Sequence, residues 1–265
     1  MKRRETIESI IAEMTRRWRK LDAAGDFRAV FAASYLATTE RVLHATTTSH
    51  GFRDPAWIVQ IDCNFAERYF DAFDAFERAD ACPRPWEIAF RHATERRTAV
   101  VQDILLGMNA HIAYDLPQSL DATIERDASP ERLAERRADY ERLNDVLADA
   151  VNHVQRRAAW AYDPLMMLAD IALGDLDEGL TSRVIEVWRT RVWERFLLLR
   201  RAADPDARRM VEQYVEGTAV GAAELLVEPQ RLVPGLLGPV RAWRRSVGWI
   251  RRGALLARVR RRPRT

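Results

Sequence analysis

The sequence has few of the features that mark secreted, zinc-binding or membrane-spanning proteins. Only two cysteines, Cys63 and Cys82, occur among 265 residues, and they have no CxxC spacing. We therefore expect two small buried side chains rather than a disulfide or a zinc knuckle. The N-terminus lacks the apolar core of roughly 7–15 residues that a signal peptide needs. No run approaches the roughly 20 apolar residues of a membrane span, so we expect a cytoplasmic protein.

Helix-breaking residues are also scarce. The chain has 11 glycines and 11 prolines, while 48% of its residues are hydrophobic. Alanine, leucine, arginine and glutamate dominate, and this composition favours helices. Neither an alternating β pattern nor an internal repeat is visible. The sequence therefore predicts an all-α fold, with residues 1–228 forming one bundle-like domain of nine or so helices.

Apolar residues at helical spacing, together with capping residues, locate these helices. Asp26 is a candidate N-cap, and Pro55 and Pro130 are good first helical residues. Pro117 either ends a helix or starts a new turn. The expected helices cover residues 4–23, 27–45, 55–78, 96–113, 130–160, 164–173, 181–201 and 205–227. A further helix is expected to begin at residue 86 and to pause near residue 93. The polar run 46–54 is expected to be a loop.

Charge is divided unevenly along the chain. Residues 229–265 contain eleven arginines and no Asp, Glu or Lys. The other 31 basic residues face 39 acids in residues 1–228, so the body carries −8 and the tail +11. Within the tail, residues 240–265 place Val240, Trp243, Val247 and Ile250 on one side of a helix, with arginines elsewhere. This pattern is typical of a helix that lies on an anionic membrane.

One polar cluster interrupts a helix that should face the core. The apolar stripe of residues 100–108 continues, by steps of three and four, onto His111 and Asp115. A carboxylate on a buried face must be paired, and the imidazole one turn away can pair with it. Asn109 adds a donor and an acceptor. Gly107 allows a backbone or ligand to approach closely.

Polar residues on two other predicted helices could join this cluster. Asp62 lies beside the stripe that carries Phe65 and Tyr69, and Asp139 and Asn144 flank the stripe of residues 140–151. Two buried acids and a histidine could hold a divalent metal or orient a general base. The candidate catalytic residues are His111, Asp115 and Asp62; the candidate ligand-binding residues are Asn109, Asn144, Asp139 and Tyr69; the candidate metal ligands are Asp62, His111 and Asp115.

A purely structural interpretation stands beside this one. A histidine on an apolar face is usually paired with a carboxylate in the core, and a buried Asp–His–Asn network can serve only to fix helix register. The remaining histidines fit no HxxxH or HExxH spacing, so the usual zinc motifs are absent. If a metal binds, one histidine with carboxylates favours iron, manganese or magnesium.

Several segments resemble a bacterial family of unknown function. The most specific is GMNAHIAYDLP at 107–117; the others are YLATTERV at 35–42, FRDPAWIVQIDCNFAERYFDA at 52–72, RPWEIAF at 84–90 and DYERLNDVL at 139–147. The similarity covers roughly residues 25–225 and excludes the tail. The resemblance implies that Asp62, Asn109, His111, Asp115, Asp139 and Asn144 belong to one shared pattern, and it implies no particular activity.

Three functions compete at this point. The first is a metal-dependent or acid–base enzyme acting on a small apolar molecule. The second is a non-enzymatic helical binding or scaffold protein, located peripherally at a membrane through residues 240–265; no recognised motif supports nucleic acid as the partner. The third is prenyl or terpene chemistry, but NDVLADAVN at 144–152 matches the magnesium motif of terpene cyclases poorly.

Overall fold

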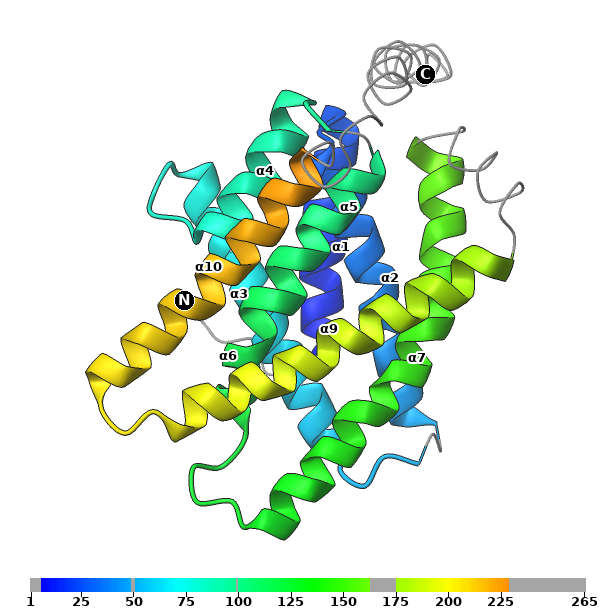
Figure 1. The fold of residues 1–265 in the computed structure, drawn as a ribbon. Helices are drawn as coiled ribbons and strands as arrows, with labels where there is room; N and C mark the ends of the chain where they lie inside the picture. The colour runs from blue at the N-terminus through cyan, green and yellow to red at the C-terminus, as the bar shows by residue number, and fades with distance from the viewer. Residues whose placement is uncertain (1–5, 49–50, 99, 163–174, 229–265) are drawn as a thin grey trace, which may run out of the picture.

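The computed structural model describes residues 6–48, 51–98, 100–162 and 175–228, and every regular element in these ranges is a helix (Figure 1). The predicted all-α fold is confirmed. In chain order the helices are α1 (Ile7–Ala24), α2 (Arg28–Thr47), α3 (Pro55–Glu77), α4 (Arg84–Glu95), α5 (Val100–Met108), the π-helix η1 (Asn109–Asp115), α6 (Leu116–Thr123), α7 (Pro130–Tyr162), α9 (Asp175–Arg201) and α10 (Pro205–Val227). The predicted helix 164–173 and the tail 229–265 lie outside the described residues.

Two Asp–Pro pairs show how the sequence starts its helices. The Asp54 carboxylate accepts a hydrogen bond of 3.0 Å from the backbone N–H of Trp57, and Pro55 opens α3. Asp204 accepts from the backbone N–H of Ala207 at 2.8 Å in the same way, at the start of α10. Each carboxylate satisfies one backbone donor that the first helical turn leaves unpaired. Both start positions agree with the prediction from sequence.

Other helix boundaries differ from those predicted. The helix expected over 96–113 starts only at Val100, because Arg96 has a left-handed backbone (φ 55°) that ends α4. Helix α2 extends into the expected loop as far as Thr47. There the hydroxyls of Thr46 and Thr47 donate back to the Leu43 carbonyl at 2.9 and 3.0 Å. Helix α9 begins earlier than expected, at Asp175.

The helices pack in layers around the segment α5–η1–α6. In Figure 1, α9 and α10 diverge from a short turn and cross one side of this segment, while α1 and α2 lie on the other side. The π-helix packs against α3, α4, α9 and α10. One hydrophobic cluster draws side chains from α1 through to α10. Side chains of η1 that face inward are therefore enclosed by helices from both ends of the chain.

The π-helix explains how the chain passes Pro117 without stopping. The backbone N–H of Leu116 donates to the carbonyl of His111, five residues earlier, which is the hydrogen bond of a π turn. Pro117 has no N–H to donate and occupies the first turn of α6. The Ala113 carbonyl instead accepts a hydrogen bond of 3.1 Å from the Arg195 guanidinium of α9. Of the two alternatives for Pro117, the start of a new turn is the one observed.

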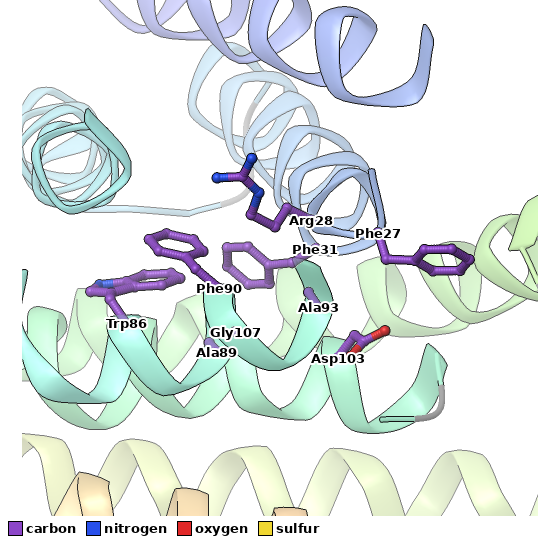
Figure 2. Close-up of a pocket in the computed structure, with 9 residues that line it drawn as sticks. All are labelled: Phe27, Arg28, Phe31, Trp86, Ala89, Phe90, Ala93, Asp103 and Gly107. Atoms are coloured by element: carbon purple, nitrogen blue, oxygen red, sulfur yellow. The ribbon is translucent and has the colours of Figure 1, made fainter. Parts of the chain in front are cut away.

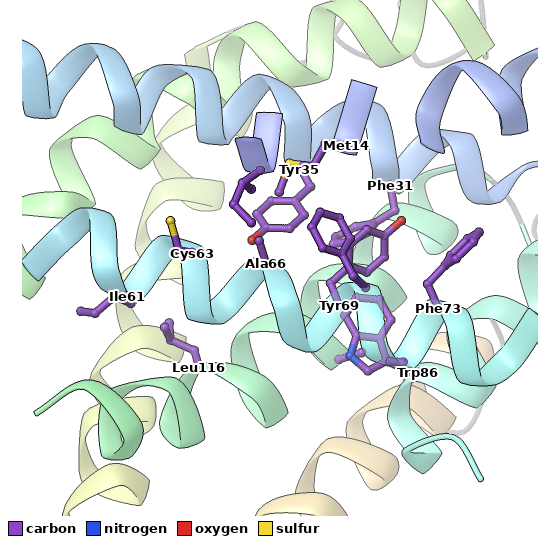
Figure 3. Packing of buried hydrophobic residues seen from close by; sticks show 14 of the residues in the cluster. Met14, Phe31, Tyr35, Ile61, Cys63, Ala66, Tyr69, Phe73, Trp86 and Leu116 are labelled. Carbon is purple, nitrogen blue, oxygen red and sulfur yellow. The ribbon is translucent and has the colours of Figure 1, made fainter. Parts of the chain in front are cut away.

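Aromatic side chains form the part of the core beside η1. Figure 3 shows Phe31 and Tyr35 from α2, Tyr69 and Phe73 from α3, and Trp86 from α4 gathered between these helices. Tyr69 and Trp86 have 1% and 0% of their surfaces exposed. None of the described helices combines the length and apolarity needed to cross a bilayer.

Candidate functional site

The polar residues of η1 are buried, as the apolar stripe predicted. Asn109, His111 and Asp115 expose 2%, 4% and 2% of their surfaces. His111 Nδ1 lies 3.3 Å from Asp115 Oδ2, so the two side chains pair along the helix. We call them the His111–Asp115 dyad. The spacing of four residues was correctly interpreted from sequence, although the helix that carries it is a π-helix rather than an α-helix.

Trp86 extends the dyad by one hydrogen bond. Its indole Nε1 donates to Asp115 Oδ2 at 2.8 Å, and its side chain is fully buried. The proline-rich start of α4 aims the indole at η1, because Trp86 follows Pro85 in the first helical turn. The sequence alone did not indicate Trp86 as a site residue, and its place in the segment RPWEIAF was the only signal for it. The Oδ2 oxygen of Asp115 thus contacts both Trp86 and His111.

Five aromatic rings surround the His111 imidazole. Phe65 stacks on it with ring centroids 3.3 Å apart and planes 7° from parallel, and Tyr35 approaches its face edge-on at 4.2 Å. The other three have centroid distances of 5.8–6.4 Å. We call this group the aromatic cage: Phe31, Tyr35, Phe65, Tyr69 and Trp86. It fixes the orientation of the imidazole and separates it from bulk water.

Three polar atoms near the dyad are buried, and no group of the described residues lies within hydrogen-bonding distance of them. They are His111 Nε2, the Tyr35 hydroxyl and Asp62 Oδ2. The Asp62 and Asp115 charges both raise the pKa of Tyr35, after burial as the main cause, so both acids lie near this side chain. Each unsatisfied buried group costs about 1–3 kcal/mol. Buried polar atoms without a partner are uncommon in native cores, so each of these three atoms calls for an explanation.

Burial shifts both members of the dyad toward their neutral forms. It raises the pKa of Asp115 to about 8, although the Trp86 hydrogen bond and the Arg68 charge act in the opposite direction. It lowers the pKa of His111 well below its usual range. Burial also raises the pKa of Asp62 to about 7. Near neutral pH the dyad therefore has no net charge, and a neutral imidazole stacks on Phe65.

Tyr69 contributes its ring but not its hydroxyl to the surroundings of His111. Its ring centroid lies 6.4 Å from that of the imidazole. Burial raises the pKa of its hydroxyl, and the charges that act on it come from Arg17 and Arg28 first, not from Asp62 or Asp115. The hydroxyl thus faces the arginines that bridge α1, α2 and α3. The predicted ligand-binding role of Tyr69 finds support only for its aromatic face.

Asn109 points away from the dyad, toward α10. Its Nδ2 donates to the Ala219 carbonyl at 2.8 Å, and both residues are buried. This bond joins η1 to the last described helix. In this structure the Asn109 amide fixes helix packing, and it is not directed at the aromatic cage.

Asp139 and Asn144 also have partners elsewhere. The Asp139 carboxylate accepts from the backbone N–H groups of Arg53 and Asp54, both at 2.8 Å, and so fixes the chain before α3. Asn144 Oδ1 accepts from Arg189 Nε at 2.5 Å, between α7 and α9. No hydrogen bond or ring contact within the described ranges joins either residue to the aromatic cage. The structure therefore brings His111 and Asp115 into contact, and among the residues it describes the only link from Asp62 to this region is the charge that Asp62 exerts on Tyr35. It leaves the α7 residues in separate positions.

A small pocket adjoins the aromatic cage. Its volume is about 10 Å³, and it is lined by Phe27, Arg28, Phe31, Trp86, Ala89, Phe90, Ala93, Asp103 and Gly107 (Figure 2). Phe31 and Trp86 belong to both the pocket and the cage. The pocket has the size of roughly one water molecule, so a larger molecule reaches His111 only if Phe31 or a neighbour moves.

Gly107 makes the position of Phe31 possible. A Cβ atom added at Gly107 would overlap the Phe31 ring. The close approach of α5 to α2 therefore depends on this glycine. The sequence analysis identified Gly107 as a point of close approach, and the approaching group is a side chain of the cage.

A third metal ligand is not assembled beside the dyad. The described ranges contain no group of three or more His, Cys, Asp or Glu side chains placed to hold one metal ion. The divalent-metal assignment of Asp62, His111 and Asp115 stays a prediction without supporting geometry, and we derive no step through a metal.

The fold and the dyad define an all-α protein with a buried histidine–carboxylate pair. Residues 7–229 match a family of unknown function, DUF5995. The chain belongs to this family, which confirms the resemblance to an uncharacterised family noted in the sequence. No curated protein and no solved structure matches the chain.

Proposed function

We propose that this protein is an acid–base enzyme that acts on a small, largely apolar molecule, with His111 as the proton-transferring group. One observation carries the proposal. The chain Trp86–Asp115–His111 holds Nδ1 of the imidazole and leaves Nε2 buried without a partner among the described residues. Tyr35, whose ring centroid lies 4.2 Å from that of the imidazole, and Asp62 carry two further polar atoms that are unpartnered within the same ranges. A histidine held at one nitrogen and open at the other has the arrangement that general acids and bases use.

The protonation of the dyad determines which role His111 takes. Below about pH 8, where Asp115 is protonated, its hydroxyl donates to Nδ1 and the imidazole proton is on Nε2, so His111 can act as an acid. Above that pH Asp115 is a carboxylate that accepts from Nδ1–H, and Nε2 becomes a base. Proton transfer at Nε2 therefore requires a matching shift between Nδ1 and Asp115, which keeps the imidazole neutral and places the negative charge on Asp115, where Trp86 donates to it.

The lining of the site favours a small apolar substrate with one polar group. Aromatic side chains provide most of the surface around His111, and the polar atoms of Tyr35 and Asp62 provide hydrogen bonds to a hydroxyl, carbonyl or amine. Since the adjoining pocket is only about 10 Å³, binding includes movement of the cage. We place Phe31 at this step because it lines both spaces.

The test uses two readouts with the full chain. The first is thermal denaturation with a library of small alcohols, ketones and amines that carry aromatic or short aliphatic groups. The second is incorporation of solvent deuterium into C–H positions of the compounds that stabilise the protein, followed by NMR. Deuterium incorporation detects acid–base catalysis without knowledge of the natural reaction.

His111→Gln is compared with wild type, and His44→Gln, at an exposed position of α2, is the matched control. We expect compounds that raise the Tm of wild type and the control, with deuterium exchange at least tenfold slower in His111→Gln. Equal exchange in all three proteins would contradict an acid–base role. If no compound in the library stabilises any of the proteins, the small-molecule proposal fails.

A further inference from the structure

The large apolar side chains on the surface are concentrated on the last two helices. Among the described residues the exposed ones are Val187, Leu198, Met210, Tyr214 and Leu225, all on α9 and α10. Met210 and Tyr214 expose 71% and 54% of their surfaces, and Leu225 exposes 38%. Single exposed apolar residues are common, but their restriction to one part of a fold marks a contact surface.

Three of these side chains lie on one face of α10. Met210, Tyr214, Gly217, Gly221 and Leu225 follow one another at steps of four, three, four and four residues, and we call them the α10 outer face. A Cβ added at either glycine would meet nothing within 4 Å. The outer face is thus an apolar strip with a shallow, open centre.

The opposite face of α10 is the one that packs on the protein. Val215, Ala219 and Ala223 expose 0–1% of their surfaces, and Ala219 accepts the hydrogen bond from Asn109. Between residues 217 and 227 Glu224 is the only charged residue. A helix that is apolar on both sides is normally covered on both sides. The described residues cover one side only.

We propose that the protein's own C-terminal segment, residues 240–250, covers the α10 outer face. The covalent connection favours this occupant, since α10 ends at Val227 and Leu225 is already part of the outer face. The segment places Val240, Trp243, Val247 and Ile250 at helical spacing, which matches an apolar strip. The family match ends at residue 229, so the segment lies outside the part of the chain that the family model covers.

The connecting chain is long enough to reach. Residues 229–239 span up to about 36 Å when extended, whereas α10 rises about 23 Å between Met210 and Leu225. A helix that turns back at the end of α10 would run antiparallel along the outer face. A tether of this length keeps the segment at a local concentration on the order of millimolar, so a weak contact is sufficient.

Charge favours the same contact. The segment 229–265 carries +11, whereas residues 1–228 carry −8. Glu224, exposed beside the outer face, and Glu228 lie at the end of α10 nearest the segment. Arginines on the polar side of the segment can approach these carboxylates while its apolar side contacts Tyr214 and Leu225. We therefore expect added salt to weaken the contact only in part, because apolar contact does not depend on screening.

Photocrosslinking in the full chain tests this proposal. A benzophenone amino acid replaces Tyr214 at the centre of the outer face, and in a control protein it replaces exposed Glu40 on α2. After irradiation in buffer, gel electrophoresis separates intramolecular from intermolecular products, and mass spectrometry of peptides locates the bond. We expect an intramolecular bond from position 214 to residues 240–250, and at least fivefold less of it from position 40.

Variants of the segment distinguish docking from mere proximity. Val247→Asp with Ile250→Asp, made together, should reduce the crosslink at least fivefold, whereas Ala242→Asp on the other side of the predicted helix should leave it unchanged. Equal yields in all three proteins would show that tethering alone gives the product and would overturn the proposal.

The other occupants give different products. A crosslink between two copies would assign the outer face to self-association and overturn the proposal. The proposal would also be overturned if no product formed in buffer and the full chain bound to vesicles of anionic phospholipid. The segment would then belong to a membrane surface.

Discussion

The Trp86 indole and the Asp115 carboxylate are joined by a hydrogen bond of 2.8 Å in the interior of the protein. The bond reaches from the first turn of α4 to the last residue of η1, and it holds the oxygen that also faces His111 Nδ1. A donor at this position stabilises the carboxylate form of Asp115 without adding a charge. Trp86 therefore helps to position the acid that orients His111, and it lowers the pKa of that acid against the larger effect of burial.

Trp86→Phe removes this bond while keeping an aromatic ring in the cage. At neutral pH Asp115 is protonated, and a hydrogen bond between neutral groups contributes about 0.5–1.5 kcal/mol, so we expect the free energy of unfolding to fall by roughly that amount beyond the loss of ring area. The pKa of Asp115 should rise further above about 8, because the bond acts to lower it. Urea denaturation and NMR titration of labelled aspartate would measure the two effects.

The chain provides a matched control at Trp57. This side chain is also buried, but its Nε1 has no hydrogen-bond partner among the described residues. Trp57→Phe therefore removes a similar area of ring without removing a hydrogen bond. If both variants lose the same stability, the bond between Trp86 and Asp115 contributes nothing beyond packing.

Asp115→Asn should fix the tautomer of His111. Trp86 Nε1–H and His111 Nδ1 both contact the Oδ2 position, so the amide oxygen takes that place and accepts from both. The imidazole proton therefore stays on Nδ1 at every pH. In wild type the proton moves to Nδ1 above about pH 8, as Asp115 ionises. Long-range ¹H–¹⁵N NMR spectra at pH 7 and pH 9 distinguish the two tautomers. Asp62→Asn keeps Asp115 and should behave as wild type; identical spectra of all three proteins at pH 7 would exclude a switch driven by Asp115.

Gly107→Ala should displace Phe31. The added Cβ overlaps the Phe31 ring, and the backbone of α5 cannot retreat because it is packed against α2 and α4. Overpacking of this kind costs about 1–3 kcal/mol. At Gly217 the space is open, so the same change should instead stabilise α10 by about 0.5–1 kcal/mol. Chemical denaturation of both variants gives the two signs, and stabilisation by Gly107→Ala would contradict the contact with Phe31.

The sequence predicted the helices more fully than the site because helix periodicity is a local property. The positions of His111 and Asp115 on one buried face followed from their spacing in a single segment. The partners of these residues did not follow, since Trp86, Tyr35 and Phe65 come from other helices and look like ordinary core residues in sequence. The π turn could not be predicted either, because it depends on a residue of another helix. Pro117 has no N–H to donate to the Ala113 carbonyl, and Arg195 of α9 donates to that carbonyl instead.

The polar residues of α7 were candidates for the site from sequence, but in the structure they bind other groups. Asp139 and Asn144 interrupt an apolar stripe just as Asp62 does, yet Asp139 binds two backbone N–H groups and Asn144 binds Arg189. Periodicity identifies a buried polar group but not its partner. A buried acid that satisfies a loop and one that faces a histidine have the same appearance in a single sequence.

The contribution of Asp62 to the stability of the folded protein should depend on pH. Burial raises the pKa of its folded-state carboxyl to about 7 from an ordinary value of 3.8. Between these values the native protein retains a proton that the unfolded chain has released, so the stability of wild type falls as pH rises through this window. Asp62→Asn cannot ionise and should lack this slope. Its free energy of unfolding should equal that of wild type within error near pH 4 and exceed it by up to about 4 kcal/mol above pH 8, at 1.36 kcal/mol per pKa unit.

Urea denaturation at pH 4, 6 and 8 measures the difference between Asp62→Asn and wild type. Asp145→Asn, at an exposed position of α7, is the control for removal of one acid. A difference between Asp62→Asn and wild type that stays constant across these pH values would mean that the Asp62 carboxyl does not change its ionisation in the folded protein, and its place beside the Tyr35 hydroxyl would then need another explanation.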